Sequence, residues 1–216
     1  MVGPARETAR YNRANLPNQL YDQHNAGCGQ VYEAIGLDKG RRMLTVMLSA
    51  RNSRFFMIVD DDDFVSANIV EFAARNADAN GWKIDCGYLW NEGGRLLLHH
   101  NDFANFCGTS LIIRSDLYRL PATFEDADIN YIKSMLGSHV RIGKMLADQG
   151  HPLGSLPFRG AIYRVGHSGA HSKSSNLIRT HFLNSSVLRH PRQFLRNLSR
   201  VRLLGRELRG EFSGTV

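Results

Sequence analysis

The chain is poor in cysteine and has no long apolar run, and both absences exclude certain classes of protein. Of its 216 residues only Cys28, Cys86 and Cys107 are cysteines, and they lie too far apart in sequence to form a CxxC pair. The sequence therefore predicts neither a disulfide framework nor a zinc ribbon. No stretch reaches the roughly 20 apolar residues that a membrane-spanning helix needs. The N-terminal residues also lack the apolar core of a secretion signal, so we expect a cytoplasmic protein.

Acidic residues are scarce toward the C-terminus. In the range 179–209, eight arginines stand against one acid, Glu207, within a chain of net charge +7. We expect 176–216 to be a basic helical tail, broken at Pro191, that meets an anionic surface at the inner face of a membrane. A solvated helix face is the alternative. Basic motifs interleaved with aromatic residues are absent, so nucleic acid is not an expected partner.

Acidic residues are concentrated elsewhere, directly after a short apolar run. Four consecutive aspartates, Asp60 to Asp63, follow Phe55–Val59, whose length and branching predict a fully buried strand. Adjacent carboxylates repel one another unless a cation, such as a hard divalent ion, neutralises them. Ligands of open α/β sheets collect beyond the carboxyl ends of strands, so the pattern predicts a metal-binding site there. An acidic turn that caps the next helix is the alternative, because Asp is a favoured N-cap.

Apolar spacing predicts an α/β fold around this strand. A turn signal at 91–94 indicates a hairpin, and Gly150 suits the end of a helix. The expected helices span 31–50, with a break around 36–40, and 66–76, 128–135 and 139–149. The other expected strands span 84–90, 95–99, 106–114 and 156–165.

The order of these segments resembles that of glycosyltransferases with the glycosyltransferase-A fold, closest to the large inverting family 2. The resemblance covers about residues 39–175 and depends most on 55–64, which is similar to the family's buried strand and DxD motif. It implies an α/β fold with a mixed, mostly parallel sheet flanked by helices. It also implies one domain over 1–175, in which 1–38 is a divergent or incomplete nucleotide-binding part.

The same resemblance assigns roles to the aspartates. Asp60 and Asp61 would lie near the nucleotide of a donor, most simply a UDP-sugar. Asp62 would hold Mn²⁺ or Mg²⁺, which neutralises the departing diphosphate. The register stays open, since Asp61 or Asp63 also fits as the metal ligand. Family members often carry an arginine about one helix upstream, a position that Arg42 or its neighbour Arg41 fits; a solvated helix start is the alternative.

Two further segments are similar to parts of the family that lie near the donor. The segment 105–114 resembles the strand that begins the acceptor half, where a small residue, here Gly108, lets the acceptor approach; a plain core strand is the alternative. The segment 161–172 resembles a strand and loop that supply a metal-binding histidine. His167 fits best and His171 second, and a histidine ligand would favour manganese. A polar loop with surface histidines is the alternative.

The chain departs from the family at the general base. The family places Glu-Asp before a helix, whereas the helix beginning near Val140 is preceded by Ser138-His139. Imidazole accepts a hydroxyl proton near neutral pH, so we expect His139 to act as the base. Asp126 and Asp128 remain alternatives, and so does a His139 that merely begins a helix.

The N-terminal part also departs from the family. Only 59 residues precede Asp60, whereas the fold usually has on the order of 90, including an initial strand that holds the base. A truncated product, a divergent segment, and a smaller sheet with weak or no activity all fit this difference.

The sequence thus predicts a metal-dependent inverting glycosyltransferase. It would move a hexose from a nucleotide-diphosphate sugar to a hydroxyl of a glycan or lipid-linked acceptor, in surface polysaccharide synthesis. One alternative is a Mg²⁺-dependent phosphohydrolase built on the aspartates, although a haloacid-dehalogenase-type site would carry Thr close behind them, where Phe64 stands. The other is a degenerate, non-catalytic transferase module.

Overall fold

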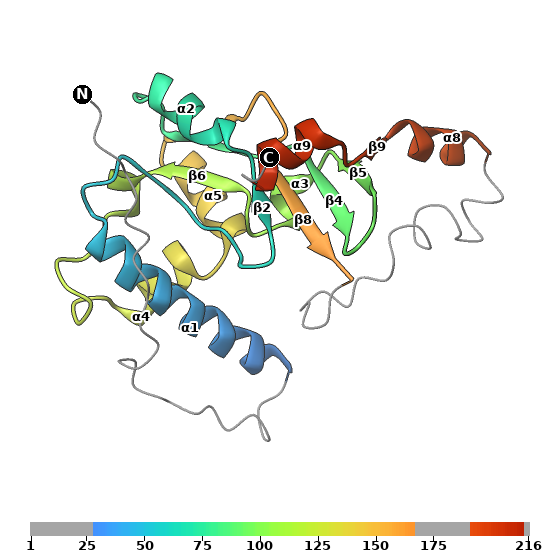
Figure 1. The fold of residues 1–216 in the computed structure, drawn as a ribbon. Coiled ribbons are helices and arrows are strands. Elements are labelled where there is room, and N and C mark those ends of the chain that lie inside the picture. The colour runs from blue at the N-terminus through green and yellow to red at the C-terminus, as the bar shows by residue number, and fades with distance from the viewer. Residues whose placement is uncertain (1–27, 167–190, 214–216) are drawn as a thin grey trace. The chain divides into compact units, whose positions relative to one another are not determined.

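The computed structural model describes residues 28–166 and 191–213. The chain divides into two compact units between Ile35 and Gly36, a point inside helix α1 (Cys28–Ser49). The second unit, Gly36–Val216, contains all of the described strands. Its strands and helices alternate along the chain, which confirms the predicted α/β class (Figure 1).

Short strands and short helices make up this unit. After α1, the helical segments are α2 (Asn68–Arg75), α3 (Phe103–Phe106), the 3₁₀ turn η2 (Ser115–Tyr118), α4 (Ile129–Tyr131), the π-helical turn η3 (Ile132–Leu136), α5 (His139–Asp148), α8 (Pro191–Ser199) and α9 (Arg206–Ser213). The strands are β1 (Phe55–Met57), β2 (Phe64–Val65), β3 (Gly81–Lys83), β4 (Gly87–Asn91), β5 (Leu96–His100), β6 (Leu111–Arg114), β7 (Gly154–Ser155), β8 (Ala161–Val165) and β9 (Val201–Leu203).

The strands form two sheets, and these are mixed rather than mostly parallel, so that part of the prediction is wrong. Sheet A has the order β1-β6-β3-β7, and sheet B has the order β2-β8-β4-β5-β9. Within the described residues only β3 with β7 and β4 with β8 pair in parallel. The reason is connectivity: β4 and β5 are joined by a tight turn, and such a turn can link only antiparallel neighbours.

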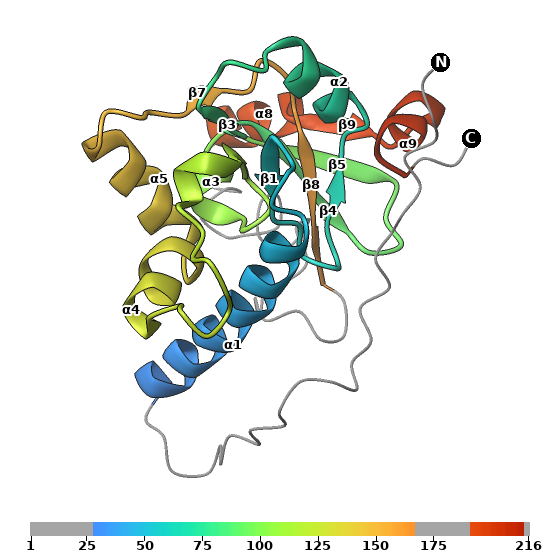
Figure 2. The same ribbon diagram turned by 90° about the vertical axis from the view of Figure 1, so that its left-hand side faces the viewer.

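Sheet A is covered on both faces, which explains its continuous apolar sequence. In β6, Leu111 and Ile113 pack with Leu44 of α1 and Leu146 of α5. Ile112, between them, faces the other way and packs in a second cluster. Successive side chains of a strand point to opposite faces, so a strand buried on both sides needs apolar residues at every position. Helices α1 and α2 lie on opposite sides of the strands in both views (Figure 1, Figure 2).

Sheet B shows the same alternation. Leu89 of β4 and Leu98 of β5 join the cluster shared with sheet A. Their neighbours Tyr88 and Leu97 face away from it and pack with Phe212 of α9. Helix α9 therefore helps to form a separate apolar cluster on the outer face of sheet B.

The run before the aspartates is half-buried, not fully buried as predicted. Strand β1 stops at Met57, its residues are of intermediate exposure, and Val59 is 43% exposed. The reason is position: within the described residues β1 pairs only with β6, so it is the edge strand of sheet A. An edge strand leaves one side of its backbone unpaired, and its last residues lie closer to solvent.

Several predicted elements are confirmed. Helix α2 falls inside the predicted 66–76, and α5 occupies the predicted 139–149. Gly150 has φ of +81°, as the glycine after a helix commonly does. The predicted hairpin is formed by β4 and β5, and the amide of Gly94 donates to the carbonyl of Asn91 at 2.8 Å in its turn.

Other segments differ from prediction. The strand expected over 106–114 is shortened to β6, because α3 precedes it. The strand expected over 156–165 is shortened to β8. The expected helical tail is interrupted, since β9 lies between α8 and α9 and hydrogen-bonds to β5. Among the described helices, none combines the length and the apolar character needed to cross a bilayer.

Candidate active site

The four aspartates form a tight turn rather than a converging cluster. The amide of Asp63 donates to the carbonyl of Asp60 at 3.1 Å, which closes a turn with Asp61 and Asp62 at its tip. Asp61 is exposed. Within residues 28–166 and 191–213 no three Asp, Glu, His or Cys side chains are grouped so that they could hold a metal ion. A turn separates neighbouring carboxylates, and this relieves the repulsion that the sequence suggested a cation must relieve.

Asp60 is the aspartate that is built into a site. Its backbone amide donates to Oγ1 of Thr109 at 2.9 Å, and its carboxylate forms an ion pair with Lys39 of α1. A Cβ atom on Gly108 would lie 2.9 Å from Asp60 Oδ2, closer than such contacts occur. Gly108 therefore lets the Asp60 carboxylate approach the chain. The approach of an acceptor at this place stays a prediction.

Asp63 is turned toward the interior instead. Its carboxylate accepts a hydrogen bond from Cys107 Sγ at 3.2 Å and from the Arg164 amide at 3.4 Å. Burial raises the pKa of Asp63, and the neighbouring Asp62 adds to this, while hydrogen bonds from Thr109 and Cys107 lower it in part. Burial and the charge of Asp63 also raise the pKa of Cys107, so the thiol stays a donor. These contacts make Asp63 a structural link between the turn and β8.

A small cavity lies beside Asp60. Its volume is about 80 Å³, enough for a few waters or a small chemical group but below the roughly 300 Å³ of common ligand sites. Lys39, Gly108 and His139 border it, and the remaining lining is mostly apolar: Met43, Ile58, Leu111, Tyr118, Met135, Leu136, Gly137, Ser138 and Ile142. The cavity can therefore enclose a reacting group but not a whole sugar nucleotide.

His139, the first residue of α5, faces this cavity with an unpaired nitrogen. Its Nε2 atom is buried and has no hydrogen-bond partner among the described residues, so its hydrogen bond to the Asn105 backbone involves Nδ1. Burial lowers the pKa of His139, and the nearby Lys39 lowers it further, whereas Asp60 and the Asn105 bond raise it. The pKa of the ring is thus lower than the ordinary 6.5 of histidine, which favours the neutral form with Nε2 as the acceptor.

Lys39 is the main residue that the sequence patterns missed. They favoured Arg42, but Arg42 is exposed and pairs with Asp38 on the same face of α1. The helix break expected around 36–40 is wrong, because α1 is continuous there. The glycine next to Lys39 has another cause: a Cβ on Gly40 would come within 2.6 Å of Ile132. A glycine in a helix marks close packing, which fixes the side of α1 that meets the core.

The other predicted residues lie elsewhere. Asp126 is exposed and accepts from the amide and hydroxyl of Thr123 at 3.0 and 2.9 Å. Asp128 caps α4 by accepting from the amide of Asn130 at 3.1 Å. Neither residue lines the cavity that His139 borders, so these two alternative candidates for the general base do not lie at the site. His167 and His171 fall outside the described residues.

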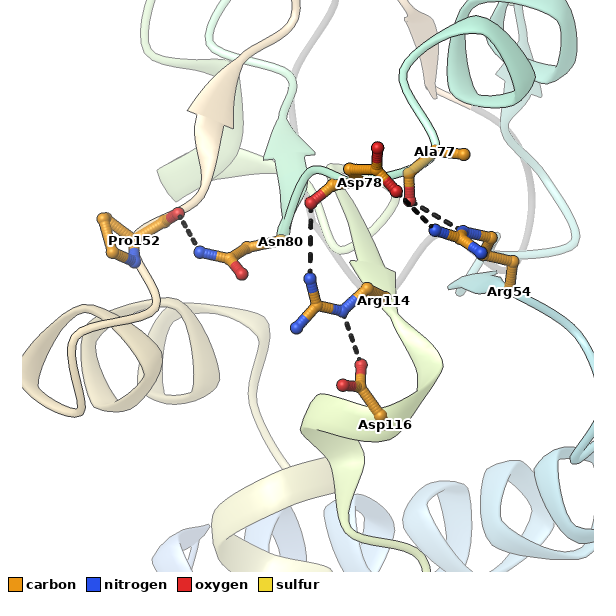
Figure 3. A network of polar contacts seen from close by, with 7 residues as sticks. All are labelled: Arg54, Ala77, Asp78, Asn80, Arg114, Asp116 and Pro152. Carbon is orange, nitrogen blue, oxygen red and sulfur yellow. Dashed lines mark hydrogen bonds and ion pairs between the residues drawn. The ribbon is translucent and has the colours of Figure 1, made fainter.

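A second hollow lies at the opposite end of β1, around Arg54 and Arg114. It is open and has a volume of about 490 Å³. Arg114 donates to Asp116 Oδ1 at 2.7 Å and to the Asp78 carbonyl at 3.4 Å, while Arg54 pairs with the Asp78 carboxylate at 2.9 Å (Figure 3). The hydrogen bond from Arg114 lowers the pKa of Asp116. These guanidinium groups tie the loop before β3 to β1 and β6.

Sheet B carries a buried histidine among arginines. His99 is 8% exposed, and its Nδ1 lies 3.0 Å from Nη2 of Arg159. Because arginine can only donate, this nitrogen accepts, and the ring is neutral. Burial lowers the pKa of His99 to about 4, and Arg159, Arg202 and Arg200 contribute to the shift.

We expect acid to destabilise the fold through His99. In the unfolded chain its pKa is 6.5 and in the folded chain about 4, so only the unfolded state gains a proton between these values. The contribution of the neutral His99 ring to the free energy of unfolding is complete above pH 6.5 and is lost as the pH falls toward 4. The total loss is at most about 3 kcal/mol. Urea unfolding across this range measures it. The variant His99→Gln, which keeps an acceptor for Arg159, should lose this share of the pH dependence; an unchanged slope would contradict the assignment.

No protein family, curated protein or solved structure matches the chain. What it does is therefore inferred from the arrangement of Asp60, Lys39, Gly108 and His139.

Proposed function

We propose that the chain is a glycosyltransferase of the glycosyltransferase-A type that moves a sugar from a nucleotide-diphosphate donor to a hydroxyl group. One observation carries the proposal. Asp60, Gly108 and His139 come from three separate motifs, and they are neighbours in the folded chain: Gly108 and His139 border one cavity, and Asp60 contacts Gly108 and Lys39 at its edge.

The charges around the cavity suit a departing diphosphate. Lys39 places an ammonium group at the cavity wall, where it pairs with the half-buried carboxylate of Asp60. The Lys39 side chain is 45% exposed, so water screens part of its charge. Its ion pair with Asp60 holds the ammonium group in place, and a cation already in position stabilises negative charge that develops during a reaction. In this proposal Lys39 faces the diphosphate, and Asp60 holds Lys39 and the nucleotide in place.

His139 supplies the proton acceptor. The acceptor oxygen attacks the anomeric carbon as the bond from that carbon to the diphosphate oxygen breaks, and Nε2 of His139 takes the hydroxyl proton. The nucleotide diphosphate leaves with the bonding electrons, and the configuration at the anomeric carbon inverts. The free, buried Nε2 and the lowered pKa of His139 both favour this role.

A divalent ion, when bound, would add positive charge to the diphosphate. The predicted ligands are Asp62, at the tip of the turn, and His167, which lies outside the described residues. The described residues alone do not complete a metal site. The steps above are therefore assigned only to Lys39, Asp60 and His139, and Mn²⁺ or Mg²⁺ remains a prediction.

Nucleotide binding tests the proposal. We expect UDP or another nucleoside diphosphate, with Mn²⁺ present, to raise the melting temperature by about 5 °C or more at saturating concentration. Mg²⁺ alone should have little effect, and Asp62→Ala should remove the part of the shift that depends on Mn²⁺.

Other outcomes would replace the proposal. Release of phosphate from a generic phosphoester would indicate a hydrolase. The absence of any response to a panel of nucleoside diphosphates and nucleotide sugars would indicate a non-catalytic module.

A further inference from the structure

Helix α8 and strand β9 leave large apolar side chains in solvent. Leu195, Leu198 and Leu203 are 62%, 53% and 68% exposed. Only a few residues further on, Phe212 is buried against Tyr88 in the core of sheet B. The C-terminal segment thus buries one set of apolar residues and leaves another on the surface, which in soluble proteins usually marks an interaction site.

The exposed leucines lie on a segment that is anchored to the sheet. Strand β9 pairs with β5, and this places Leu203 directly opposite Leu96, which is itself 42% exposed. Arg200 donates from Nε to the carbonyl of His99 at 2.9 Å. Asn197 of α8 is 4% exposed, so one face of the helix is covered. The exposure of the leucines therefore belongs to the folded arrangement and not to an unattached end.

Arginines flank the leucines in a regular way. On α8, Leu195 and Leu198 are three residues apart and share a face, while Arg192 and Arg196 are four apart and share the adjacent face. Both arginines are exposed. Residues 191–205 contain no Asp or Glu, so nothing within the segment offsets these charges.

We propose that this surface binds an anionic lipid membrane. The α8–β9 surface consists of Arg192, Leu195, Arg196, Leu198 and Leu203. Leucines beside arginines on one short amphipathic segment suit the boundary between acyl chains and phosphate headgroups, where the leucines enter and the guanidinium groups stay at the phosphates. Nucleic acid would use the arginines but not the leucines, and a second copy of the chain would bring the same positive charge against them. The inference does not depend on the proposed function.

Vesicle co-sedimentation of the full chain tests it. We expect binding to vesicles of phosphatidylcholine with phosphatidylglycerol at low salt, and weak binding to phosphatidylcholine alone. Arg192→Gln with Arg196→Gln should weaken binding about 25-fold, since each arginine near an anionic surface contributes about a fivefold factor. Leu195→Ser with Leu198→Ser should weaken it about tenfold or more through lost apolar contact.

Matched variants elsewhere test whether vesicle binding needs this surface or only positive charge and exposed apolar side chains in general. Arg141→Gln with Lys144→Gln removes two exposed charges from α5, and Val70→Ser removes an apolar side chain that is 76% exposed on α2. Both should bind vesicles like the wild type, and all variants should melt at similar temperatures. Equal binding to neutral and anionic vesicles, unchanged binding of both α8 variants, or a dimer that Leu195→Ser with Leu198→Ser dissociates would overturn the proposal.

Discussion

Replacing Asp60 by asparagine is expected to lower the rate of sugar transfer at least about a hundredfold. The substitution keeps the shape of the side chain and removes the charge that holds Lys39. Without it the ammonium group is no longer fixed at the cavity wall, and its interaction with a departing diphosphate weakens. Nucleotide release from a panel of nucleotide sugars, followed in the presence of acceptor glycans, measures the rate.

The matched control for this change is Asp126→Asn. It also neutralises one aspartate, but Asp126 is exposed and bonded to Thr123, away from the cavity. The control variant should transfer sugar at the wild-type rate. Asp60→Asn at full activity, or an equal loss in both variants, would remove Asp60 from the site.

Replacing His139 by alanine is expected to reduce turnover by about two to four orders of magnitude, as loss of a general base does, while nucleotide binding persists. The variant should therefore keep the thermal shift with UDP and lose sugar transfer. His151→Ala, which removes a histidine beyond the other end of α5, should change neither. A His139→Ala enzyme with full turnover would show that another group takes the proton.

If His139 is the base, the rate of sugar transfer should depend on pH in a way that follows the pKa of His139. Because burial and Lys39 lower the pKa of His139, the neutral, proton-accepting ring persists below pH 6.5, and the rate should fall only as the pH drops further. Lys39→Met removes one cause of the lowering, so the pKa of His139 should rise and the acid limb should move to higher pH. NMR titration of the His139 ring reports the same shift even if Lys39→Met is inactive. A downward shift would contradict the arrangement.

Local patterns predicted the elements of this fold better than their pairing. The hairpin of β4 and β5 and helix α5 depend on nearby residues, such as the turn at Gly94 and the glycine at position 150, and they are confirmed. The apolar run of β1 predicted a strand, but neither its edge position nor its antiparallel partner follows from its own residues. Those depend on β6, more than fifty residues later, and on how the intervening chain returns.

The same limit applies to the candidate site. Gly108 and His139 could be singled out because each stands within a motif, and both border the cavity. For Lys39, the neighbouring Gly40 indicates only which side of α1 meets the core, and one lysine in a helix carries no sign of the carboxylate that it meets in the folded chain. The aspartates are the opposite case: adjacency in sequence suggested one shared ion, whereas the turn sends Asp60 toward Lys39 and Asp63 toward Cys107.

Hydrogen exchange with and without nucleotide shows where in the chain the ligand binds. With UDP and Mn²⁺, or with whichever nucleoside diphosphate gives the largest thermal shift, we expect slower exchange in peptides covering 58–63, 106–111 and 137–142, which surround Asp60, Gly108 and His139. Peptides covering 51–54 and 114–116, at the second hollow, should exchange as before. Protection at that second hollow alone, or nowhere in the chain, would mean that Asp60, Gly108 and His139 do not form a nucleotide-sugar site.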